Sequence, residues 1–584
     1  MSVVGFKAVT YPLSKLLEDI EMGEIGLPEI QRPFVWQNAK VRDLFDSMYR
    51  GFPVGSLLFW VNGFSDTHKQ IGTNQKQNVP RLLIVDGQQR LTSLYAVLRG
   101  RKVIKKDYSE GSIRIAFMPK DQRFEVADAA IERDSEFIAD ISQLWSGELS
   151  RKRFVQEFIT SLRQHREVSD QEEDQLWESI DQLYDLQNYP FTVLELSATV
   201  PEEQVSQVFV RINSAGASLN QADFILTLMS VFWEDGRTEL EDFCRSARQP
   251  STGPASPFNH YIQPDADQLL RVVVALAFRR ARLQHVYSLL RGKDLETEEF
   301  SVERRDQQFS VLREAQTYVL DLQNWHDFLK ALLQAGFRSA EMITSKTAVL
   351  YSYALFLIGK REYHVASHTL RRLIARWFFM GSLTRRYPTS PESVMEQDLA
   401  LLRDVEDAEA FVARLDRVIG DALPEDYWGI TLPNALATSS ARSPTLLAYH
   451  AALAILDAKV LFSKVKVSEL LDPAFKAKRA ATERHHLFPK GHLAKLGIKA
   501  VRDTNQIANY ALVEWGDNAA IGDKAPAEYL PEYTSRFSQD ELNSLWHSHA
   551  LPRGWEDMPY QDFLAERRQL IAGVIREGFG RLGD

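Results

Sequence analysis

The stretch of sequence that decides the fold of the C-terminal part reads Glu483-Arg484-His485-His486-Leu487-Phe488-Pro489-Lys490. A second run follows further along the chain and reads Asn505-Gln506-Ile507-Ala508-Asn509-Tyr510-Ala511-Leu512-Val513. Asn518 comes shortly after this run. Two adjacent imidazoles therefore precede two spaced amide side chains, an order that predicts a β-hairpin followed by a helix.

These residue types suit the hydrolysis of a phosphodiester. An imidazole can take a proton from water near neutral pH, and a divalent cation can neutralise the phosphate and the departing oxygen. We expect His486 to be the general base and His485 to bind the metal. Asn509 would lie on the second strand and hold the hairpin and the base in place, and Asn518 would complete the metal site through its amide oxygen. The pattern predicts a one-metal nuclease of the ββα type.

A His-His pair alone is commonly a surface or capping feature. The ordered spacing with Pro489, Asn509 and Asn518 favours the nuclease. The local charge also favours the nuclease. Residues 459–502 contain eleven Lys and Arg and three Asp and Glu, which gives a local net charge of +8. A basic segment around the motif suits a polyanionic substrate, although a solvated lysine-rich helix end would have the same composition.

The composition is that of a globular protein of two or three domains. The chain has 584 residues, with 45% hydrophobic and 25% charged residues and a net charge of −10. Cys244 is its one cysteine, so internal disulfides and cysteine zinc sites are excluded. A metal site built from His, Asn and water favours Mg²⁺ or a similar ion. The N-terminal residues have no signal pattern and no apolar run approaches membrane-spanning length, so we expect a cytoplasmic protein.

The first part of the chain, residues 1–230, has the pattern of a mixed α/β domain. Helical spacing predicts helices over 12–22, 41–49 and 201–212, and short apolar runs predict strands over 54–61, 81–85, 112–118 and 191–196. After the run at 81–85, the Asp86-Gly87 turn leads into a predicted helix that ends at Gly100.

Helices dominate the next part, residues 231–442. Apolar residues at helical spacing predict helices over 269–290, 312–328, 347–358 and 370–383, and Pro250 to Gln263 is typical of a loop. Ser443-Pro444 then predicts a helix start, and a helix over 445–462 leads into the nuclease domain, residues 443–584. The expected fold class is α+β and multidomain.

A second group of polar residues lies at Asp86-Gly87-Gln88-Gln89-Arg90, between a predicted strand and a predicted helix. Free N–H groups at such a junction attract anions, and an arginine can bind phosphate oxygens in pairs. Similar elements are Gln31-Arg32-Pro33 and Arg211-Ile212-Asn213. Each could also be purely structural, since Asp-Gly is commonly just a turn. The chain contains neither a Walker A loop nor a G-x-G-x-x-G fingerprint.

Taken together, these motifs resemble the GmrSD-type restriction endonuclease family. The N-terminal resemblance rests on Gln31-Arg32-Pro33 with Trp36, on Val85 to Thr92, and on Arg211-Ile212-Asn213, and the C-terminal one on His485 to Lys524. It implies a ParB/sulfiredoxin-like N-terminal domain that binds and hydrolyses a nucleoside triphosphate (ATP, GTP or CTP), a helical connector, and a C-terminal HNH nuclease. Many HNH sites place Asp where this chain has His485, so Mn²⁺ or Ni²⁺ could replace Mg²⁺.

The resemblance implies nucleotide-regulated cleavage of modified phage DNA by the single polypeptide. The nucleotide contacts would come from Gln31, Arg32, Asp86 to Arg90, Arg211 and Asn213. One HNH site per chain is compatible with a homodimer for double-strand cutting. Two other functions fit the motifs: a nucleotide-switched DNA-binding protein of the ParB kind with a vestigial nuclease, and a non-selective DNA nickase.

Overall fold

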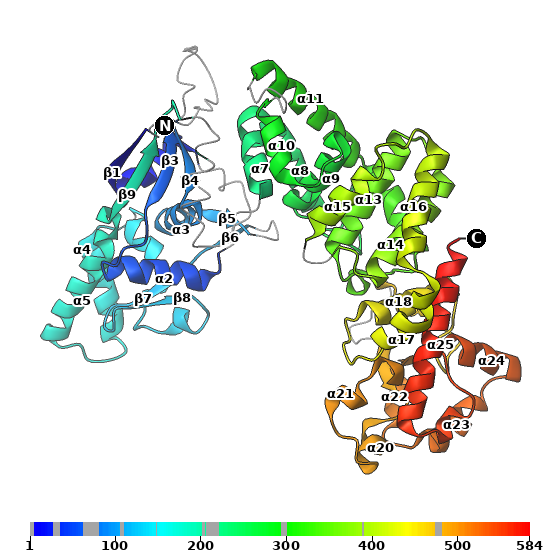
Figure 1. Ribbon diagram of the computed structural model, residues 1–584. Coiled ribbons are helices and arrows are strands. Elements are labelled where there is room, and N and C mark those ends of the chain that lie inside the picture. Colours follow the sequence, from blue (N-terminus) through cyan, green and yellow to red (C-terminus); the bar gives the residue numbers. More distant parts are fainter. Residues whose placement is uncertain are drawn as a thin grey trace. The chain divides into compact units, whose positions relative to one another are not determined.

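A computed structural model of the chain (Figure 1) separates into two compact units, Met1–Asn220 and Gln221–Asp584. The residues that the structure describes are 5–26, 36–61, 81–105, 110–147, 149–200, 205, 221–293, 301–387, 390–473 and 482–583. None of the described helices has the length and apolar composition needed to cross a membrane. The predicted division at 230/231 and 442/443 stays a prediction.

The N-terminal unit is built on a mixed five-stranded sheet in the order β1-β9-β3-β4-β2. β9 pairs antiparallel with β1 and parallel with β3, while β4 pairs antiparallel with β3 and parallel with β2. The strands are β1 (Phe6–Pro12), β2 (Ile25–Gly26), β3 (Leu57–Val61), β4 (Leu82–Asp86) and β9 (Pro190–Leu196). The strands predicted over 54–61, 81–85 and 191–196 are therefore confirmed, whereas β1 was not predicted.

Helices and two small hairpins complete this unit. The helices are α1 (Leu13–Glu21), α2 (Asn38–Tyr49), α3 (Gln88–Leu98), α4 (Arg151–Arg163) and α5 (Asp170–Tyr184), and the hairpins pair β5 (Lys102–Ile104) with β6 (Glu110–Ser112) and β7 (Ile115–Met118) with β8 (Arg123–Val126). The single strand predicted over 112–118 is wrong, because residues 110–112 and 115–118 pair in different hairpins. The helix predicted over 201–212 lies outside the described residues except for residue 205, which is helical.

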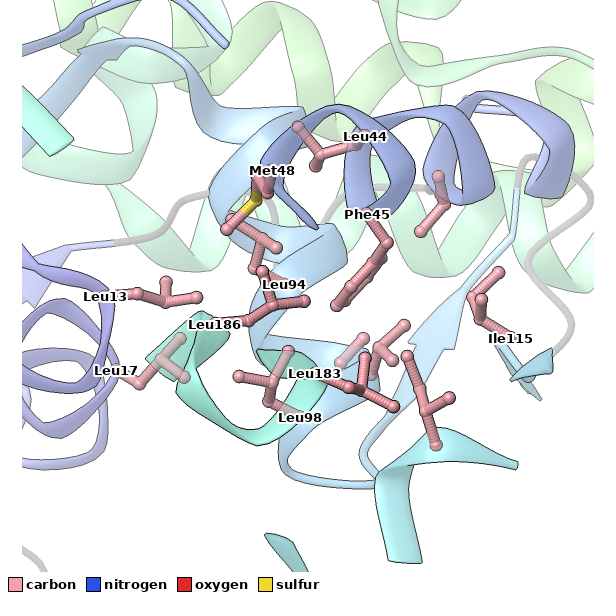
Figure 2. Packing of buried hydrophobic residues seen from close by; sticks show 14 of the residues in the cluster. Leu13, Leu17, Leu44, Phe45, Met48, Leu94, Leu98, Ile115, Leu183 and Leu186 are labelled. Atoms are coloured by element: carbon pink, nitrogen blue, oxygen red, sulfur yellow. The ribbon is translucent and has the colours of Figure 1, made fainter. Parts of the chain in front are cut away.

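The main core of the N-terminal unit forms where α1, α2 and α3 meet the end of α5. Leu13 and Leu17 of α1, Phe45 of α2 and Leu94 of α3 converge with Leu183 in Figure 2. The sheet has a second, smaller apolar cluster, since alternate residues of a strand point to opposite faces: Leu57 and Phe59 enter the main core, whereas Leu58 packs with Leu196, Val200 and Val205. The β4–α3 junction is thus anchored on a buried strand and a buried helix.

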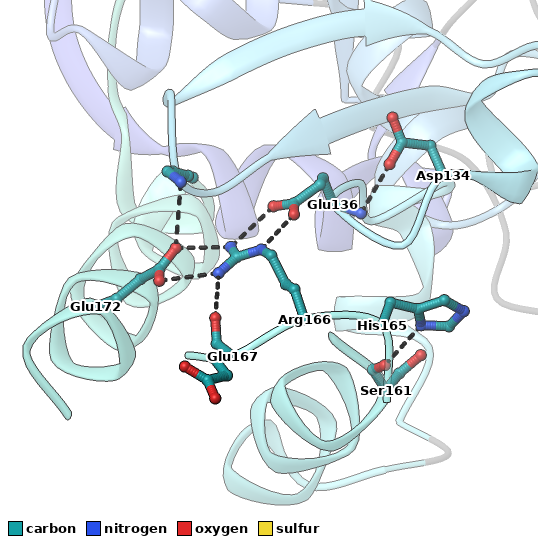
Figure 3. A network of polar contacts seen from close by, with 8 residues as sticks. Asp134, Glu136, Ser161, His165, Arg166, Glu167 and Glu172 are labelled. Atoms are coloured by element: carbon teal, nitrogen blue, oxygen red, sulfur yellow. Dashed lines mark hydrogen bonds and ion pairs between the residues drawn. The ribbon is translucent and has the colours of Figure 1, made fainter. Parts of the chain in front are cut away.

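An arginine network ties the loop before α4 to the start of α5. Arg166 donates to Glu136 and to Glu172 (Figure 3). The Lys120 ammonium lies 3.5 Å from the Glu172 carboxylate. Hydrogen bonds from the Arg166 guanidinium lower the pKa of Glu136 and the pKa of Glu172. This partly exposed network links the segments that carry Glu136, Arg166 and Glu172.

The C-terminal unit is mainly helical. Its first part contains α7 (Gln221–Phe232), α8 (Glu234–Ser246), α9 (Ala266–Phe278), α10 (Leu283–Leu290), α11 (Val302–Val319), α12 (Leu322–Gln334), α13 (Lys346–Arg361), α14 (Ser367–Leu383), α15 (Pro391–Ala400) and α16 (Ala408–Ala422). The helices predicted over 347–358 and 370–383 are confirmed. No helix or strand covers residues 250–263, as predicted for a loop.

Two of the long predicted helices are wrong because each is two helices. The segment 269–290 breaks at Arg279, which takes a left-handed conformation with φ of +54° and ends α9. The segment 312–328 breaks before Asp321, whose side chain accepts from the Asn324 N–H and caps α12. In both cases the following helix contacts the preceding one.

The last part of this unit contains a two-stranded sheet among short helices. Its elements are α17 (Leu432–Ala435), α18 (Pro444–Ile455), α19 (Val467–Leu470), β10 (Thr482–His486), α20 (Lys490–Lys495), α21 (Val501–Thr504), β11 (Tyr510–Glu514), α22 (Trp515–Ile521), α23 (Pro526–Thr534), α24 (Gln539–Ser548) and α25 (Tyr560–Arg581). Pro444 begins α18 as predicted, but this helix stops at Ile455 rather than 462, because Asp457 has a φ of +55°. α25 packs along α18.

Candidate functional site

The predicted hairpin and helix are present around the two histidines. β10 pairs antiparallel with β11, with His485 opposite Ala511 and His486 opposite Tyr510. α22 begins directly after β11 and contacts both strands. The chain therefore brings the His-His pair and the start of the following helix into one small unit.

The two imidazoles lie in different surroundings, since neighbours on a strand point to opposite faces. His485 is 2% exposed, and its ring meets the Tyr529 ring edge-on with the centroids 5.8 Å apart. His486 is half-buried, and its ring centroid lies 4.8 Å from that of Tyr510. Of the two, His486 is the imidazole with access to solvent.

A side chain that the sequence analysis did not assign to the site faces His486. The His486 Nε2 atom lies 3.0 Å from Asn505 Oδ1. An amide oxygen accepts hydrogen bonds and does not donate them, so this contact places the ring proton on Nε2. A neutral His486 then carries its lone pair on Nδ1, the atom that can take a proton. Asn505 stands in the quoted motif four residues before Asn509, but nothing in the spacing marks it as a partner of the histidine.

Asn509 is fully buried and closes the loop that follows His486. Its Oδ1 accepts from the Phe488 N–H at 2.8 Å, and its Nδ2 donates to the carbonyls of Phe488 and Thr504, each at 3.0 Å. Its own carbonyl accepts from Leu487 at 2.8 Å. Asn509 ends a short 3₁₀ turn just before β11, whereas the sequence analysis expected it on the strand itself. The Asn509 side chain thus holds Phe488, which follows β10, and Thr504, which precedes β11.

A buried arginine on α25 holds the same turn from the other side. Arg567 is 0% exposed and donates from its terminal nitrogens to the carbonyls of Ala508 and Tyr510, each at 2.8 Å, and to His549 at 2.9 Å. Burial lowers the pKa of Arg567. The hydrogen bonds to three carbonyls offset the free-energy cost of burying this guanidinium. They also fix the backbone around the turn.

His549, whose carbonyl Arg567 contacts, is itself a buried histidine. Its Nε2 lies 2.9 Å from the carbonyl oxygen of Lys459, and the side chain is 0% exposed. Burial lowers the pKa of His549 to about 4. His549 is therefore neutral at physiological pH. Its carbonyl accepts from Arg567, which in turn holds the backbone beside β11.

The predicted metal ligands are His485 and Asn518. Asn518 is the fourth residue of α22, and its side chain lies outside the described residues. Within the described parts of the chain, no three His, Cys, Asp or Glu side chains gather in a way that could hold a metal ion. A metal site made of one imidazole, one amide and water stays a prediction.

The second predicted site lies at the β4–α3 junction. Gly87 has a φ of +93°, and a Cβ at this position would lie 2.3 Å from Leu57 Cδ2, so the turn requires glycine. Asp86 ends β4, and Gln88 and Gln89 begin α3, where backbone N–H groups have no partner within the helix. The strand, turn and helix follow one another as predicted.

Arg90 makes contacts that the sequence did not predict. Its terminal nitrogens donate to the carbonyls of Val54 and Ser56, at 2.6 and 3.0 Å, and to Asp86 at 3.2 Å. Burial lowers the pKa of Arg90. In this structure the guanidinium ties the turn to the loop before β3. Gln31, Arg32, Arg211 and Asn213 lie outside the described residues.

Comparison with known proteins finds two similarities. A segment of the chain is 25% identical over 254 residues to an uncharacterized protein of Methanocaldococcus jannaschii, which covers 38% of this chain and 42% of that protein. The chain thus spans less than half the length of that curated relative. Residues 13–230 match the family model described as the GmrSD restriction endonuclease N-terminal domain, a range that begins with α1 and includes the β4–α3 junction. Residues 13–230 are therefore similar to the N-terminal domain of the GmrSD-type restriction endonucleases.

Proposed function

We propose that this chain is a type IV restriction endonuclease that cuts modified phage DNA through a metal-dependent HNH site in its C-terminal unit. The N-terminal match supports an endonuclease with DNA as its partner. The single observation that carries the nuclease assignment is the contact between His486 and Asn505 at the end of a β-hairpin that a helix follows. It presents a half-buried imidazole with a defined tautomer.

In the proposed reaction, His486 acts through Nδ1. That atom takes a proton from a water molecule as the water oxygen bonds to phosphorus and the P–O bond to the departing oxygen breaks, while the proton on Nε2 stays hydrogen-bonded to Asn505 Oδ1. The imidazolium that forms is stabilised by this amide oxygen, because a charge-assisted hydrogen bond is stronger than a neutral one. Asn509 and Arg567 hold the backbone that fixes the position of the ring.

The proposed metal ligands are His485 and Asn518, and their chemistry fits a divalent ion only in part. α22, which carries Asn518, contacts β10, which carries His485, so the two ligands lie on adjoining elements. Since neither ligand is a carboxylate, we expect Mn²⁺ or Ni²⁺ to serve at least as well as Mg²⁺. A bound ion would neutralise the phosphate and the departing oxygen.

The test compares DNA cleavage by His486→Ala with that by His368→Ala, an exposed histidine on α14 that serves as the control. Loss of a general base should lower the cleavage rate by about 10²–10⁴-fold, whereas the control should cut at the normal rate. Substrates are modified phage DNA and plain plasmid. Normal cleavage by His486→Ala would rule out the base, and equal cleavage of both DNAs would indicate a non-selective nuclease.

For the N-terminal unit we propose binding and hydrolysis of a nucleoside triphosphate at the β4–α3 junction, with regulation of cleavage. The start of α3 offers backbone N–H groups, and Asp86 lies beside them. Asp86→Asn should abolish triphosphate hydrolysis while keeping the shape of the turn. Because Arg90 holds the loop before β3, Arg90→Lys is a better probe than alanine. A normal rate of triphosphate hydrolysis by Asp86→Asn would show that the β4–α3 junction has only a structural role.

A further inference from the structure

A cavity in the C-terminal unit lies apart from the hairpin and has an unusual excess of positive charge. Its volume is about 720 Å³, and its walls come from the first turns of α13 and α18 and from the segment that follows α14. Three cationic side chains line it, Lys346, Arg385 and Arg442, and among the described lining residues one carboxylate, Glu341, accompanies them. Segments that are distant in the sequence thus bring like charges together.

Two of these cations differ from most arginines of the same unit. Arg376 pairs with Asp416 at 2.6 Å, and Arg248 pairs with Asp265 at 2.6 Å. In contrast, neither Arg385 nor Arg442 has a side-chain hydrogen-bond or ion-pair partner within the part of the chain that the structure describes. Both side chains are exposed at the mouth of the cavity, where an anion could reach them.

The helices around the cavity add to its positive potential. Ser345 caps α13, and Pro444 is the first residue of α18, so two helix N-termini open on the same space. Lys346 is the first residue of α13, and Arg442 immediately precedes the cap of α18. A cation at a helix N-terminus is unfavourable, since this end of the dipole attracts negative charge. Arg385 follows the C-terminus of α14, where a cation is favourable without any ligand.

From the cavity, its excess of cations and their placement against two helix dipoles, we infer that this pocket binds a phosphate group. An anion would offset the excess of positive charge in the cavity and would interact favourably with the N-terminal ends of both helix dipoles. The volume suits a nucleotide or one nucleotide unit of a nucleic acid. The wall includes the buried ring of Tyr387, which gives the pocket an apolar side as well. The pocket would thus be a third phosphate site, distinct from the hairpin and from the β4–α3 junction.

The experiment measures hydrogen exchange of the full chain with and without millimolar pyrophosphate as the probe. Binding should slow exchange in the peptides that contain the first turns of α13 and α18, and the double variant Arg385→Ala/Arg442→Ala should lose this protection. Both substituted side chains are exposed, so folding should be unaffected. Arg403→Ala, an exposed arginine outside the pocket, is the control and should keep the protection.

Two further arms identify the source of the phosphate. If the ligand is a nucleotide, the double variant should bind ATP more weakly by about tenfold, equivalent to about 1.4 kcal/mol. If it is the DNA backbone, the variant should bind a short duplex more weakly, and the slope of log affinity against log salt should become shallower by about 0.9 for each phosphate that is no longer neutralised. Divalent ions are removed with EDTA, so the result does not depend on cleavage. Unchanged exchange at both helix starts, with unchanged binding of ATP and DNA, would overturn the inference.

Discussion

Replacing Asn509 by alanine should open the loop that holds His486. The substitution removes three hydrogen bonds and leaves the Phe488 N–H and the carbonyls of Phe488 and Thr504 without their side-chain partner, in a place where Asn509 itself is 0% exposed. A buried polar group that loses its partner costs about 1–3 kcal/mol. Three such groups therefore set a cost of about 3 kcal/mol at the lower end.

Hydrogen exchange of the peptide that contains Leu487 and Phe488 measures this cost locally, which avoids treating a chain of two units as a two-state system. A loss of about 3 kcal/mol should speed exchange of these amides by roughly 100-fold, since each 1.4 kcal/mol is a factor of ten. Asn543→Ala, at an exposed position on α24, is the control and should leave the peptide unchanged. Normal exchange in Asn509→Ala would refute the view that this side chain holds the loop, whatever the chain does to DNA.

Three other substitutions test the supports of the two sites. Arg567→Met leaves three carbonyls without this donor, at a cost of about 1–3 kcal/mol for each buried carbonyl, so it should speed exchange in the same peptide and lower the urea midpoint of the C-terminal unit; an unchanged midpoint would contradict the role of Arg567 in holding the turn. His549 has a lower pKa in the folded chain than in the unfolded one, so stability should be full above about pH 6.5 and fall by about 3 kcal/mol toward pH 4. His549→Gln should flatten this dependence; an unchanged pH profile would exclude His549. Gly87→Ala should unfold the N-terminal unit at lower temperature than Gly100→Ala, where a Cβ meets open space; equal melting temperatures would contradict the clash with Leu57.

The elements that the sequence predicted well have local signals. A short apolar run predicts the strand at 82–86, and Gly87 predicts the turn that follows it. Apolar residues at helical spacing predict the helix after the turn. The break at Arg279 has no such signal, because the surrounding residues include neither glycine nor proline and the apolar spacing continues across it. Tertiary packing, rather than local propensity, ends that helix.

The candidate site also has a part that the sequence predicts and a part that it does not. The order of His486, Asn509 and the following helix is a pattern along the chain, so the hairpin could be predicted. The contact of Asn505 with His486 and the reach of Arg567 to the Ala508 carbonyl depend on side-chain geometry in three dimensions. Such contacts produce no periodic pattern in the sequence. Nothing in the sequence around Arg567 distinguishes it as a buried arginine.

The position of Arg567 in the chain has a consequence for the timing of synthesis. It lies on α25, 59 residues after the Ala508 carbonyl that it holds. A ribosome that has just released β10 and β11 has therefore made both histidines but not the helix that fixes the turn between the strands. Arg567 can hold this turn only after α25 has emerged and packed along α18. A growing or prematurely ended chain would thus carry both histidines without the arginine that holds the turn between the strands.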